Sequence, residues 1–484
     1  MSRFTPIGSI RSIDAFEDYL ESLELSIPME KQVVCGAGSS LAQPIRLKKL
    51  TIGNRFAIHP MEGWDGAADG KPTENTLRRW RRFGSSGAKL IWGGEAVAVT
   101  HDGRANPNQL MAGPGTRDGL ALLREALVEE HRRTIGSVDG LVVGLQLTHS
   151  GRFSRPNSST RLEPQILYHH PLLDSRLGIE SGYPVLTDGE IRRIIEAFHK
   201  AARMAYGIGF DFVDIKHCHG YLGHEFLSAY TREGDYGGSL QNRTRFLREI
   251  VEGIRASAPS LEIGVRLSAF DTIPFRPDGQ PGSKPGTGVP EQFQDHAPYR
   301  WGFGVSSANP LEPDLSETET FISLLIDEGI ELLNVSAGSP YYNPHIQRPA
   351  LYPPSDGYLP PEDPLKGVER QMLAVRVLKQ RFPNVAMVGS AYSYLQDFLP
   401  NVAQAAVRGG WVDVVGLGRM ALAYPELPQD LLEGRPLRHK KICRTFSDCT
   451  TAPRKGLPSG CYPLDEHYKR SEAAGKLKEA KRAK

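Results

Sequence analysis

Eight short β-rich runs that alternate with amphipathic helical patterns constrain the fold of this 484-residue chain more than any other feature. Regular alternation of strand and helix favours a parallel sheet. Such an α/β sheet either closes into a (β/α)8 TIM barrel or stays open and doubly wound. The count of eight and the lack of a Gly-x-Gly-x-x-Gly sequence after the first strand favour the barrel. The predicted strands are 56–59, 89–93, 141–147, 212–216, 263–268, 331–336, 385–389 and 412–416.

The stretches between these strands carry apolar residues at helical spacing. In the clearest of them, 187–206, Thr187 as N-cap and Glu190 at the third helical position form a capping box. Ile191, Ile194 and Phe198 then share one face of the helix. The other predicted helices are 75–83, 116–135, 240–254, 321–326, 368–381 and 395–408, with a shorter pattern at 13–23.

Composition and charge exclude several classes of function. The formal net charge is +2, from 58 Lys and Arg against 56 Asp and Glu, so no overall field favours nucleic acid or a membrane surface. No apolar run reaches the length of a membrane span, and the N-terminus lacks the apolar core of a signal peptide. Five cysteines in 484 residues do not make a disulfide scaffold. We therefore expect a cytoplasmic protein with a small-molecule substrate; a homo-oligomer stays open.

The predicted barrel occupies residues 45–435, between an N-terminal extension of residues 1–44 and a C-terminal tail of residues 436–484 that carries three cysteines. Two long segments rich in glycine and proline, 274–313 and 339–364, follow the fifth and the sixth strand. Loops of this length are usually lids or binding loops, so we expect both over the mouth of the barrel. Surface insertions without function are the alternative. The end of the tail, 469–484, is expected to be a solvated helix or a frayed terminus.

Ionisable side chains gather where the fourth predicted strand ends. The apolar run 212–215 gives way to Lys216, His217, Cys218, His219 and Tyr221. Apolar packing explains the interior of a strand but does not explain such a cluster at its C-terminal end, where α/β folds bind ligands. The alternative is a strand end whose last residues are simply solvated, and the density of the cluster argues against it.

Two polar residues interrupt otherwise apolar strands. Gln146, in the third strand, carries an amide that donates and accepts at once, which suits the edge of a flat heterocycle. A hydrogen bond to neighbouring backbone is an equal alternative for Gln146. Arg266, in the fifth strand, is a cation that needs an anion or a ligand when it is buried. A structural ion pair is an equal alternative for Arg266.

Glycines end the last two strands, at Gly389-Ser390 and at Gly418-Arg419. Many barrels bind phosphate at these two strand ends, through backbone N–H groups and the positive end of a helix dipole. Arg419 adds a positive charge. The pattern therefore indicates a cofactor that carries a phosphate group.

Taken in this order, the segments resemble the old yellow enzyme family of FMN-dependent oxidoreductases. The resemblance covers about residues 44–435. It rests on Asn54-Arg55-Phe56, Pro60-Met61, the run from Gln146 to Arg152, the run from Gly209 to Leu222, Phe226-Leu227-Ser228, the run from Asp235 to Arg243, Val265-Arg266-Leu267-Ser268 and Gly418-Arg419.

The resemblance implies that FMN binds at the C-terminal mouth of the barrel. Pro60, Met61 and Glu62 would lie along the isoalloxazine, with Gly94 or Glu95 approaching it after the second strand. The other implied contacts are Gln146 at the pyrimidine edge, Arg266 beside N1 and C2=O, and Gly389, Ser390, Gly418 and Arg419 around the phosphate. The counter-ion of a buried Arg266 would then be the reduced cofactor.

The resemblance also implies ene-reductase chemistry, in which NADH or NADPH reduces the flavin and the flavin reduces an activated C=C bond. In the family pattern His-x-x-Asn/His-x-Tyr, two side chains bind the carbonyl oxygen and the tyrosine protonates the α-carbon. Here His219 and Tyr221 match the second and third positions, whereas Lys216 replaces the first histidine and His217 is added beside it. Lysine carries donors only and favours an acid or a phenolate-like substrate. It could also pair with Glu62, where the family more often has a small or thiol residue.

Other functions stay open on this evidence. One is a dehydrogenase or isomerase of the same fold, in which the substrate itself reduces FMN. A more remote one is a lyase that forms a Schiff base through Lys216. A flavoprotein without catalytic function is equally remote.

The tail carries Cys443, Cys449 and Cys461 at C-x5-C-x11-C spacing. Larger relatives, similar to 2,4-dienoyl-CoA reductase, bind a [4Fe–4S] cluster through C-x2-C-x3-C-x11-C. One cysteine is missing here, with Phe446 and Ser447 nearby. About 23 residues follow Cys461, too few for the second flavin domain of those relatives. We therefore expect a degenerate remnant and no bound metal, although three thiolates can hold a cluster.

Overall fold

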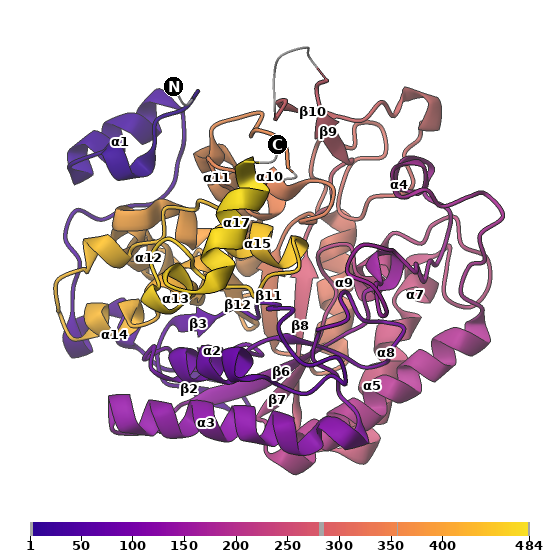
Figure 1. Ribbon diagram of the computed structural model, residues 1–484, viewed down its shortest axis with the longest axis horizontal. Helices are drawn as coiled ribbons and strands as arrows, with labels where there is room; N and C mark the ends of the chain where they lie inside the picture. Colours follow the sequence, from indigo (N-terminus) through magenta and orange to yellow (C-terminus); the bar gives the residue numbers. More distant parts are fainter. Residues whose placement is uncertain (1–2, 280–284, 356, 483–484) are drawn as a thin grey trace.

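The computed structural model describes residues 3–279, 285–355 and 357–482 (Figure 1). Eight parallel strands form a ring, in the order β4-β3-β13-β12-β11-β8-β7-β6, and pairing of β4 with β6 closes it. The predicted (β/α)8 TIM barrel is confirmed, and each strand lies within one or two residues of its predicted bounds. The strands are β3 (Phe56–Ile58), β4 (Leu90–Ile91), β6 (Val142–Thr148), β7 (Phe212–Ile215), β8 (Glu262–Ser268), β11 (Leu332–Ser336), β12 (Ala386–Gly389) and β13 (Val414–Leu417).

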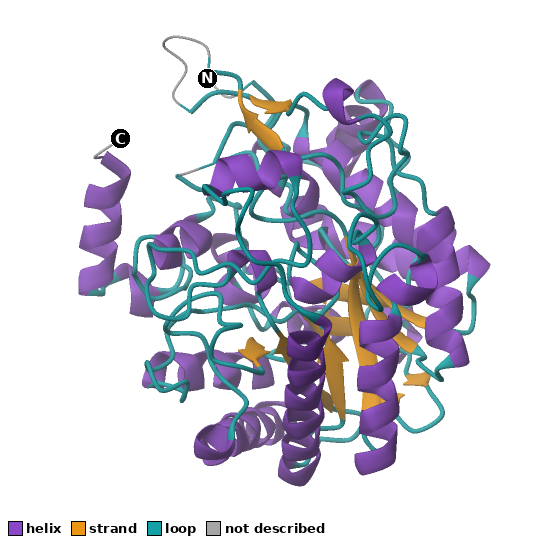
Figure 2. Ribbon diagram, turned by 90° about the vertical axis from the view of Figure 1, so that its right-hand side faces the viewer, coloured by secondary structure: helices purple, strands orange, loops and turns teal. Residues whose placement is uncertain are grey.

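Helices surround the barrel, and Figure 2 shows the outer layer that they form beside the strands. The layer contains α2 (Glu74–Gly84), α3 (Arg117–Ile135), α5 (Asp188–Ile208), α8 (Arg245–Ser257), α9 (Ser316–Asp327), α11 (Pro364–Arg381) and α12 (Leu399–Arg408). Shorter helices are α1 (Ile13–Ser22), α4 (Pro171–Leu177), α6 (Leu222–Leu227), α7 (Leu240–Arg243), α10 (Pro344–Gln347), α13 (Arg419–Ala423) and α14 (Leu427–Leu432). Within the described residues, no helix combines the length and apolar character that a bilayer crossing requires.

Local side-chain bonds explain where the helices begin and break. The capping box predicted at α5 is confirmed: the Thr187 hydroxyl accepts from the Glu190 N–H at 3.2 Å, and the Glu190 carboxylate accepts from the Thr187 N–H at 2.8 Å. The helix predicted at 240–254 is divided into α7 and α8, because the Thr244 hydroxyl bonds to carbonyls of the preceding turn. The first residues of the helix predicted at 395–408 belong to a 3-10 segment, Tyr392–Phe398, that is kinked at Gln396, where φ is +53°.

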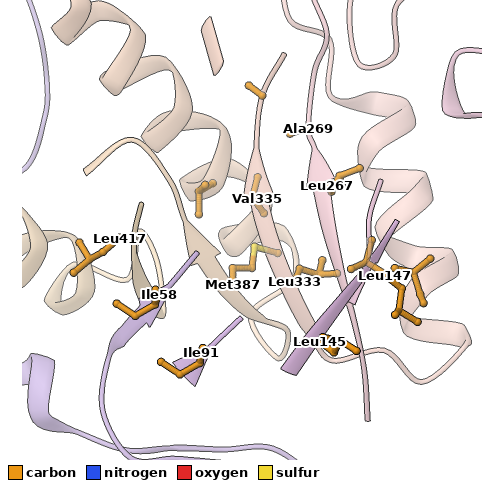
Figure 3. Close-up of a cluster of buried hydrophobic side chains, with 14 of the residues drawn as sticks. Ile58, Ile91, Leu145, Leu147, Leu267, Ala269, Leu333, Val335, Met387 and Leu417 are labelled. Atoms are coloured by element: carbon orange, nitrogen blue, oxygen red, sulfur yellow. The ribbon is translucent and has the colours of Figure 1, made fainter. Parts of the chain in front are cut away.

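Side chains of the barrel strands alternate between two apolar clusters, as the two-residue period of a strand requires. One cluster lies between the strands and the helices and includes Ile58, Ile91, Leu147, Leu267, Leu333, Met387 and Leu417 (Figure 3). The other fills the barrel interior and includes Ala57, Leu90, Phe212, Leu332 and Val414. Ile52, from the hairpin of β1 (Ile45–Arg46) and β2 (Thr51–Ile52), packs against this inner cluster.

The same alternation decides which polar side chains enter the barrel. On β7, Phe212 belongs to the inner cluster, so Asp214 and Lys216 follow on the inner side. His217 has the opposite parity, and its ring packs against Phe246 and Phe321 of the helix layer. Barrel geometry therefore separates two neighbouring residues that the sequence places in one cluster.

Additions to the barrel gather near its C-terminal end. The short strand β5 (Ala96–Ala98) extends the sheet beside β6. Segment 274–313 begins with a hairpin of β9 (Phe275–Pro277) and β10 (Gly288–Pro290), and 339–364 carries α10; residues 280–284 and 356 of these segments lie outside the described part. The Phe275 N–H donates to the Tyr342 carbonyl at 2.8 Å, so the first segment rests on the second.

The C-terminal tail folds back over the barrel (Figure 1). It carries α15 (Asp448–Arg454), α16 (Glu466–Lys469) and α17 (Glu472–Arg482), the last of which agrees with the predicted terminal helix over its described residues. Arg78 of α2 donates two hydrogen bonds to Asp465, at 2.9 and 2.8 Å. Arg79 donates to the Ser459 carbonyl at 3.2 Å. Two arginines of one barrel helix thus hold the tail.

We predict that Asp465→Ala loosens the tail without unfolding the barrel. The buried carboxylate also lies 3.8 Å from Arg82, and its loss removes the charged hydrogen bonds from Arg78. Charge-assisted bonds contribute about 1.5–3 kcal/mol each, so amide exchange across 448–470 should accelerate by at least about tenfold. Hydrogen–deuterium exchange with mass spectrometry measures this change.

The matched control is Glu466→Ala, because the Glu466 carboxylate is exposed and pairs with Lys469 and Arg470 of its own helix. Exchange in the tail of this variant should stay close to that of the unmodified chain. Equal protection of the tail in both variants would contradict the role given to Asp465.

Candidate active site

A cavity of about 230 Å³ lies at the C-terminal ends of the barrel strands. Most of the residues predicted for the site line it: Pro60, Met61, Glu62, Gln146, Lys216, His219, Tyr221, Arg266, Ser390, Gly418 and Arg419. Predicted residues that do not belong to the lining are Gly94, His217 and Gly389. The barrel thus brings together residues that are up to 359 positions apart in the chain, Pro60 and Arg419 being the extremes.

Glu62 is the centre of a hydrogen-bonded cluster in this cavity. Its carboxylate accepts from the Lys216 ammonium at 2.7 Å, from the Tyr221 hydroxyl at 2.8 Å and from the Trp64 indole N–H at 3.0 Å. The side chains of Lys216 and Glu62 are 5% and 14% exposed, so each charge depends on the other for compensation. The pairing of Lys216 with Glu62 that the sequence left open is therefore present.

Tyr221 is held in its protonated form. Burial, and then the negative charge of Glu62, raise the pKa of Tyr221 well above its ordinary value. A second tyrosine, Tyr341, bonds to the Tyr221 hydroxyl at 2.9 Å, and the Lys216 ammonium lies 3.7 Å from the centre of the Tyr221 ring. The site thus contains a buried phenol that retains its proton at neutral pH.

A tight turn brings His219 and Tyr221 to the same cavity. His219 and Gly220 both have left-handed backbone conformations, with φ of +67° and +78°. A side chain at Gly220 would also press on Tyr342, because an added Cβ would lie 2.9 Å from that ring. His219 Nε2 lies 3.1 Å from the Ser336 hydroxyl, and burial lowers the pKa of His219 well below its ordinary value. His219 is therefore a neutral imidazole.

Asp214 organises the floor of the cavity, and sequence reasoning missed it. Its carboxylate accepts from the Gln146 amide at 2.5 Å, the Trp92 indole at 2.7 Å and the Arg266 backbone N–H at 2.7 Å. Because the amide nitrogen of Gln146 faces Asp214, its carbonyl oxygen is available to the cavity. The signal was present in the sequence: Asp214 lies two residues before Lys216 on the same strand, hence on the same face.

Two buried arginines lack part of their hydrogen bonding. Among the described residues, Arg266 Nε and Arg419 Nη1 are buried without a hydrogen-bond partner. Gly418, next to Arg419, faces open space, since no heavy atom lies within 4 Å of an added Cβ. Buried donors without partners are costly, so both arginines are suited to an anionic ligand.

Three of the residues predicted for the site lie outside the cavity lining. His217 faces the helix layer, because the strand period turns it away from Lys216. Gly94 lies behind the cavity: its carbonyl accepts from the Met61 N–H at 3.0 Å, and an added Cβ would strike Trp80. Gly389 is likewise behind the lining, against Tyr392. Glu95, the alternative to Gly94, is buried in an ion pair with Arg79.

The three tail cysteines approach one another beside Arg419, where they line a small cavity of about 20 Å³. Within the described part of the chain, no group of three or more His, Cys, Asp or Glu residues is arranged to hold a metal ion. Cys449 also lines the main cavity, whereas Cys443 and Cys461 do not.

Segments outside the strand ends complete the cavity. Of the two long loops, 339–364 contributes Pro340, Tyr341, Gln347 and Arg348, as expected of a binding loop. None of the described residues of 274–313 belongs to this lining. The tail contributes Cys449, Thr450, Pro453, Arg454 and Ser459, which no pattern in the sequence indicated.

Comparisons with known proteins agree with this architecture. The model of the NADH:flavin oxidoreductase / NADH oxidase family matches residues 40–279. An NADPH dehydrogenase of Geobacillus sp. (strain WCH70) is 27% identical over 400 residues, which are 80% of this chain and 92% of that protein.

Two solved structures share the fold. One is a 2-naphthoyl-CoA reductase in complex with 2-naphthoyl-CoA, with a TM-score of 0.63 and 20% identity over 90% of this chain; the chain spans 58% of that protein. The other is an old yellow enzyme homologue from Zymomonas mobilis, with a TM-score of 0.55 and 22% identity, covering 82% of this chain and 93% of that one.

Asp214 gives a pH-dependent prediction. Burial raises the pKa of Asp214 to about 6, above about 3.9 for an unfolded chain. Because the folded state holds this proton more tightly, the stabilisation is complete below about pH 4 and is lost as the pH rises through about 6. The unfolding free energy of the unmodified chain minus that of Asp214→Asn should therefore fall by about 2–3 kcal/mol between about pH 4 and pH 7.

Urea unfolding at each pH measures this difference. Asp118→Asn is the control, because Asp118 is almost fully exposed on α3 and should show no such trend. A difference that is constant over the same pH range would show that Asp214 ionises as it does in water.

Proposed function

We propose that this chain, which belongs to the NADH:flavin oxidoreductase / NADH oxidase family and is an FMN-dependent NAD(P)H oxidoreductase, reduces the activated C=C bond of an unsaturated carbonyl or carboxyl compound. The observation that carries the proposal is the convergence of Tyr221, His219 and Lys216 on one cavity. A protonated phenol, a neutral imidazole and an ammonium are the groups that such a reduction needs on the substrate side.

The residues of the cavity fit FMN. Gln146 offers a carbonyl oxygen to a flat heterocycle, and Arg266 Nε is a buried donor without a protein partner. Gly418 and Arg419 would hold the phosphate, since the first leaves open space and the second has an unpaired buried N–H. When bound, FMN takes hydride from NAD(P)H and passes hydride to the β-carbon of the substrate.

We assign the substrate-side roles as follows. His219 and Lys216 bind the carbonyl oxygen and stabilise the negative charge that develops there. Tyr221 gives its proton to the α-carbon, and the nearby Lys216 ammonium and Tyr341 hydroxyl stabilise the resulting phenolate. In total, the substrate gains one hydride and one proton, its C=C π bond is replaced by two C–H bonds, and NAD(P)H becomes NAD(P)+. Tyr221 then regains a proton from solvent.

A second function is favoured by one observation. The Tyr221 hydroxyl donates to the Glu62 carboxylate, so a proton that Tyr221 removed from a substrate could pass to Glu62. That arrangement suits a dehydrogenase or isomerase in which the substrate reduces FMN. The Schiff-base lyase has no such support, because the Lys216 ammonium donates to Glu62 and has no free electron pair for attack.

Tyr221→Phe tests the proton-donor role. The variant should be reduced by NADPH at nearly the rate of the unmodified enzyme, because that step does not use the phenol. Re-oxidation of its flavin by an enone should slow by at least about 100-fold, the typical loss for a missing general acid. Stopped-flow flavin absorbance follows the two steps separately.

The control for this test is Tyr206→Phe, since Tyr206 is exposed on α5 and far from the cavity lining. An enone step as fast in Tyr221→Phe as in the control would contradict the role of Tyr221. Failure of NADPH to reduce the flavin on the time scale of turnover would favour the dehydrogenase or isomerase.

The Lys216–Glu62 pair gives a further prediction through a double-mutant cycle. Each single variant, Lys216→His or Glu62→Gln, leaves a buried charge without its partner. Each should therefore lower the unfolding free energy by about 3 kcal/mol. The double variant should lose clearly less than the sum, which urea unfolding measures. If the losses of unfolding free energy in the two single variants added up to that of the double variant, the two side chains would not be coupled.

The same variants separate two roles of Lys216. We expect the Lys216→His/Glu62→Gln double variant to reduce neutral enones faster than the unmodified enzyme, since a neutral imidazole then faces the substrate oxygen. Loss of all turnover in this folded variant would instead make the ammonium indispensable to the reaction.

A further inference from the structure

The loop that carries Glu62 has a strained backbone. It joins β3 to α2, and Trp64, two residues after Glu62, has a φ of +49°. A bulky side chain rarely adopts this left-handed conformation, which persists only where the surrounding structure enforces it. The conformation is accompanied by a contact in the cavity, because the Trp64 indole N–H donates to the Glu62 carboxylate at 3.0 Å. Contacts of the residues beside Trp64 must therefore hold the loop.

Arg79 of α2 contacts both neighbours of Trp64. On one side its guanidinium lies against the backbone of Gly63, where an added Cβ would be 2.1 Å from Nη1 and 2.5 Å from Cζ. On the other side it pairs with Asp65: Nη1 donates to Oδ1 at 3.2 Å, and Nη2 donates to Oδ2. One guanidinium thus clamps residues 63 and 65 on either side of the strained position.

Two further groups fix the plane of this guanidinium. Nη1 also donates to the Glu95 carboxylate, whose other oxygen accepts from the Gly63 N–H at 3.3 Å. Nη2 donates to the Ser459 carbonyl at 3.2 Å. The side chains of Arg79, Asp65 and Glu95 are only 4%, 3% and 3% exposed. A buried guanidinium between two carboxylates and a carbonyl has little freedom to rotate, because any other orientation leaves charged donors without partners.

Arg79 can influence the reaction only through this loop. The described lining of the main cavity includes Glu62 and Trp64, but it does not include Arg79. Glu62, in turn, accepts hydrogen bonds from the Lys216 ammonium at 2.7 Å and from the Tyr221 hydroxyl at 2.8 Å. A continuous series of contacts therefore leads from a helix outside the cavity to the phenol inside it.

We propose that Arg79 is a positioning residue that holds Glu62 against the proton donor Tyr221. It clamps both neighbours of Trp64, so that Trp64 keeps its strained conformation and its hydrogen bond to Glu62. The inference rests on the proposed function, because it gives Arg79 a part in the step that Tyr221 performs. Arg79 itself touches neither the substrate nor the cofactor.

A purely structural role is the competing explanation, in which Arg79 only fastens the tail to α2 through Ser459. The two roles differ in what happens once Glu62 has been replaced. A positioning residue has little further effect when the group that it positions is gone. A residue that stabilises another part of the fold has the same effect with or without Glu62, because independent sites are additive.

Fluorine NMR of the flavin-loaded full chain tests the contact without turnover. The chain has five tryptophans, so labelling with 5-fluorotryptophan gives few resonances, and Trp64→Phe identifies that of Trp64. Glu62→Gln should displace this resonance, because it removes the carboxylate that accepts the indole N–H. In Arg79→Lys, which keeps the charge but not the planar fork, the resonance should already be displaced. Adding Glu62→Gln should then move it less than about half as far as in the unmodified chain.

Gly63→Ala breaks the same contact from the other side and leaves every charge in place. Gly63 is not one of the glycines with a left-handed backbone, so the added methyl group acts only through its contact with Arg79. This variant should displace the Trp64 resonance as Arg79→Lys does, and it provides a second test if Arg79→Lys does not fold. The matched control is Arg81→Lys, an exposed arginine of the same helix, which should leave the Trp64 resonance unchanged.

Stopped-flow absorbance provides the kinetic test. Re-oxidation of the reduced flavin by an enone should slow by at least about tenfold in Arg79→Lys and in Gly63→Ala, because Tyr221 is displaced from its productive position. Reduction of the flavin by NADPH should change by less than about twofold, since that step does not use the phenol. When Glu62 is already replaced by Gln, Arg79→Lys should slow the enone step by less than about twofold more.

The outcomes separate the inference from the proposed function. Glu62→Gln displacing the Trp64 resonance equally in the unmodified chain and in Arg79→Lys would overturn the inference. Equal slowing of the enone step by Arg79→Lys with and without Glu62 would overturn it as well. If enones did not re-oxidise the NADPH-reduced flavin of the unmodified enzyme, the proposed function would fail, and the fluorine spectra would still decide whether Arg79 positions Glu62.

Discussion

Closure of the barrel is the constraint on which the rest of the structure depends. Pairing of β13 with β3 and of β4 with β6 joins the two ends of the sheet, so all eight strands deliver their C-terminal residues to one rim. Cross-barrel contacts then become possible, such as the 3.0 Å bond between His59 and Asn334 of β11. Without closure, the Asp214 carboxylate would have no access to Trp92, which directly follows β4 on the other side of β6.

Within that rim, one carboxylate determines the electrostatics of the substrate side. Glu62 neutralises Lys216 and accepts hydrogen bonds from the Tyr221 hydroxyl and the Trp64 indole N–H. The negative charge of Glu62 helps to keep the Tyr221 phenol protonated. The Lys216 cation beside the ring would stabilise the phenolate once the proton has left. The cluster is therefore balanced in the resting state and is suited to the transfer of one proton.

The fold was predictable because its signals are local. Strands of the barrel are buried on both sides, and each appears in the sequence as a short apolar run, while Thr187 and Glu190 mark a helix start by themselves. The exclusion of His217 was also within reach, since the two-residue period of β7 puts it opposite Lys216. The tail was not predictable in this way: Arg78 and Asp465 are 387 residues apart, and neither stands in a recognisable pattern. The length of loop 274–313 did not by itself predict a contribution to the cavity, because the described residues of this loop pack on another loop.

The tail separates two properties that a barrel usually combines. The residues that we propose for the cofactor and for the proton donor lie at strand ends or shortly after them, and the positions of these ends follow from barrel closure and a continuous apolar core. The tail, by contrast, forms one wall of the cavity, and it is attached both by the polar contacts of Asp465 and by Ile442, Cys443 and Cys461 in the main apolar cluster. A change in the tail would therefore alter one wall of the cavity while the strand ends stay in place. This arrangement explains why a strand-end motif predicts the reaction better than it predicts the substrate.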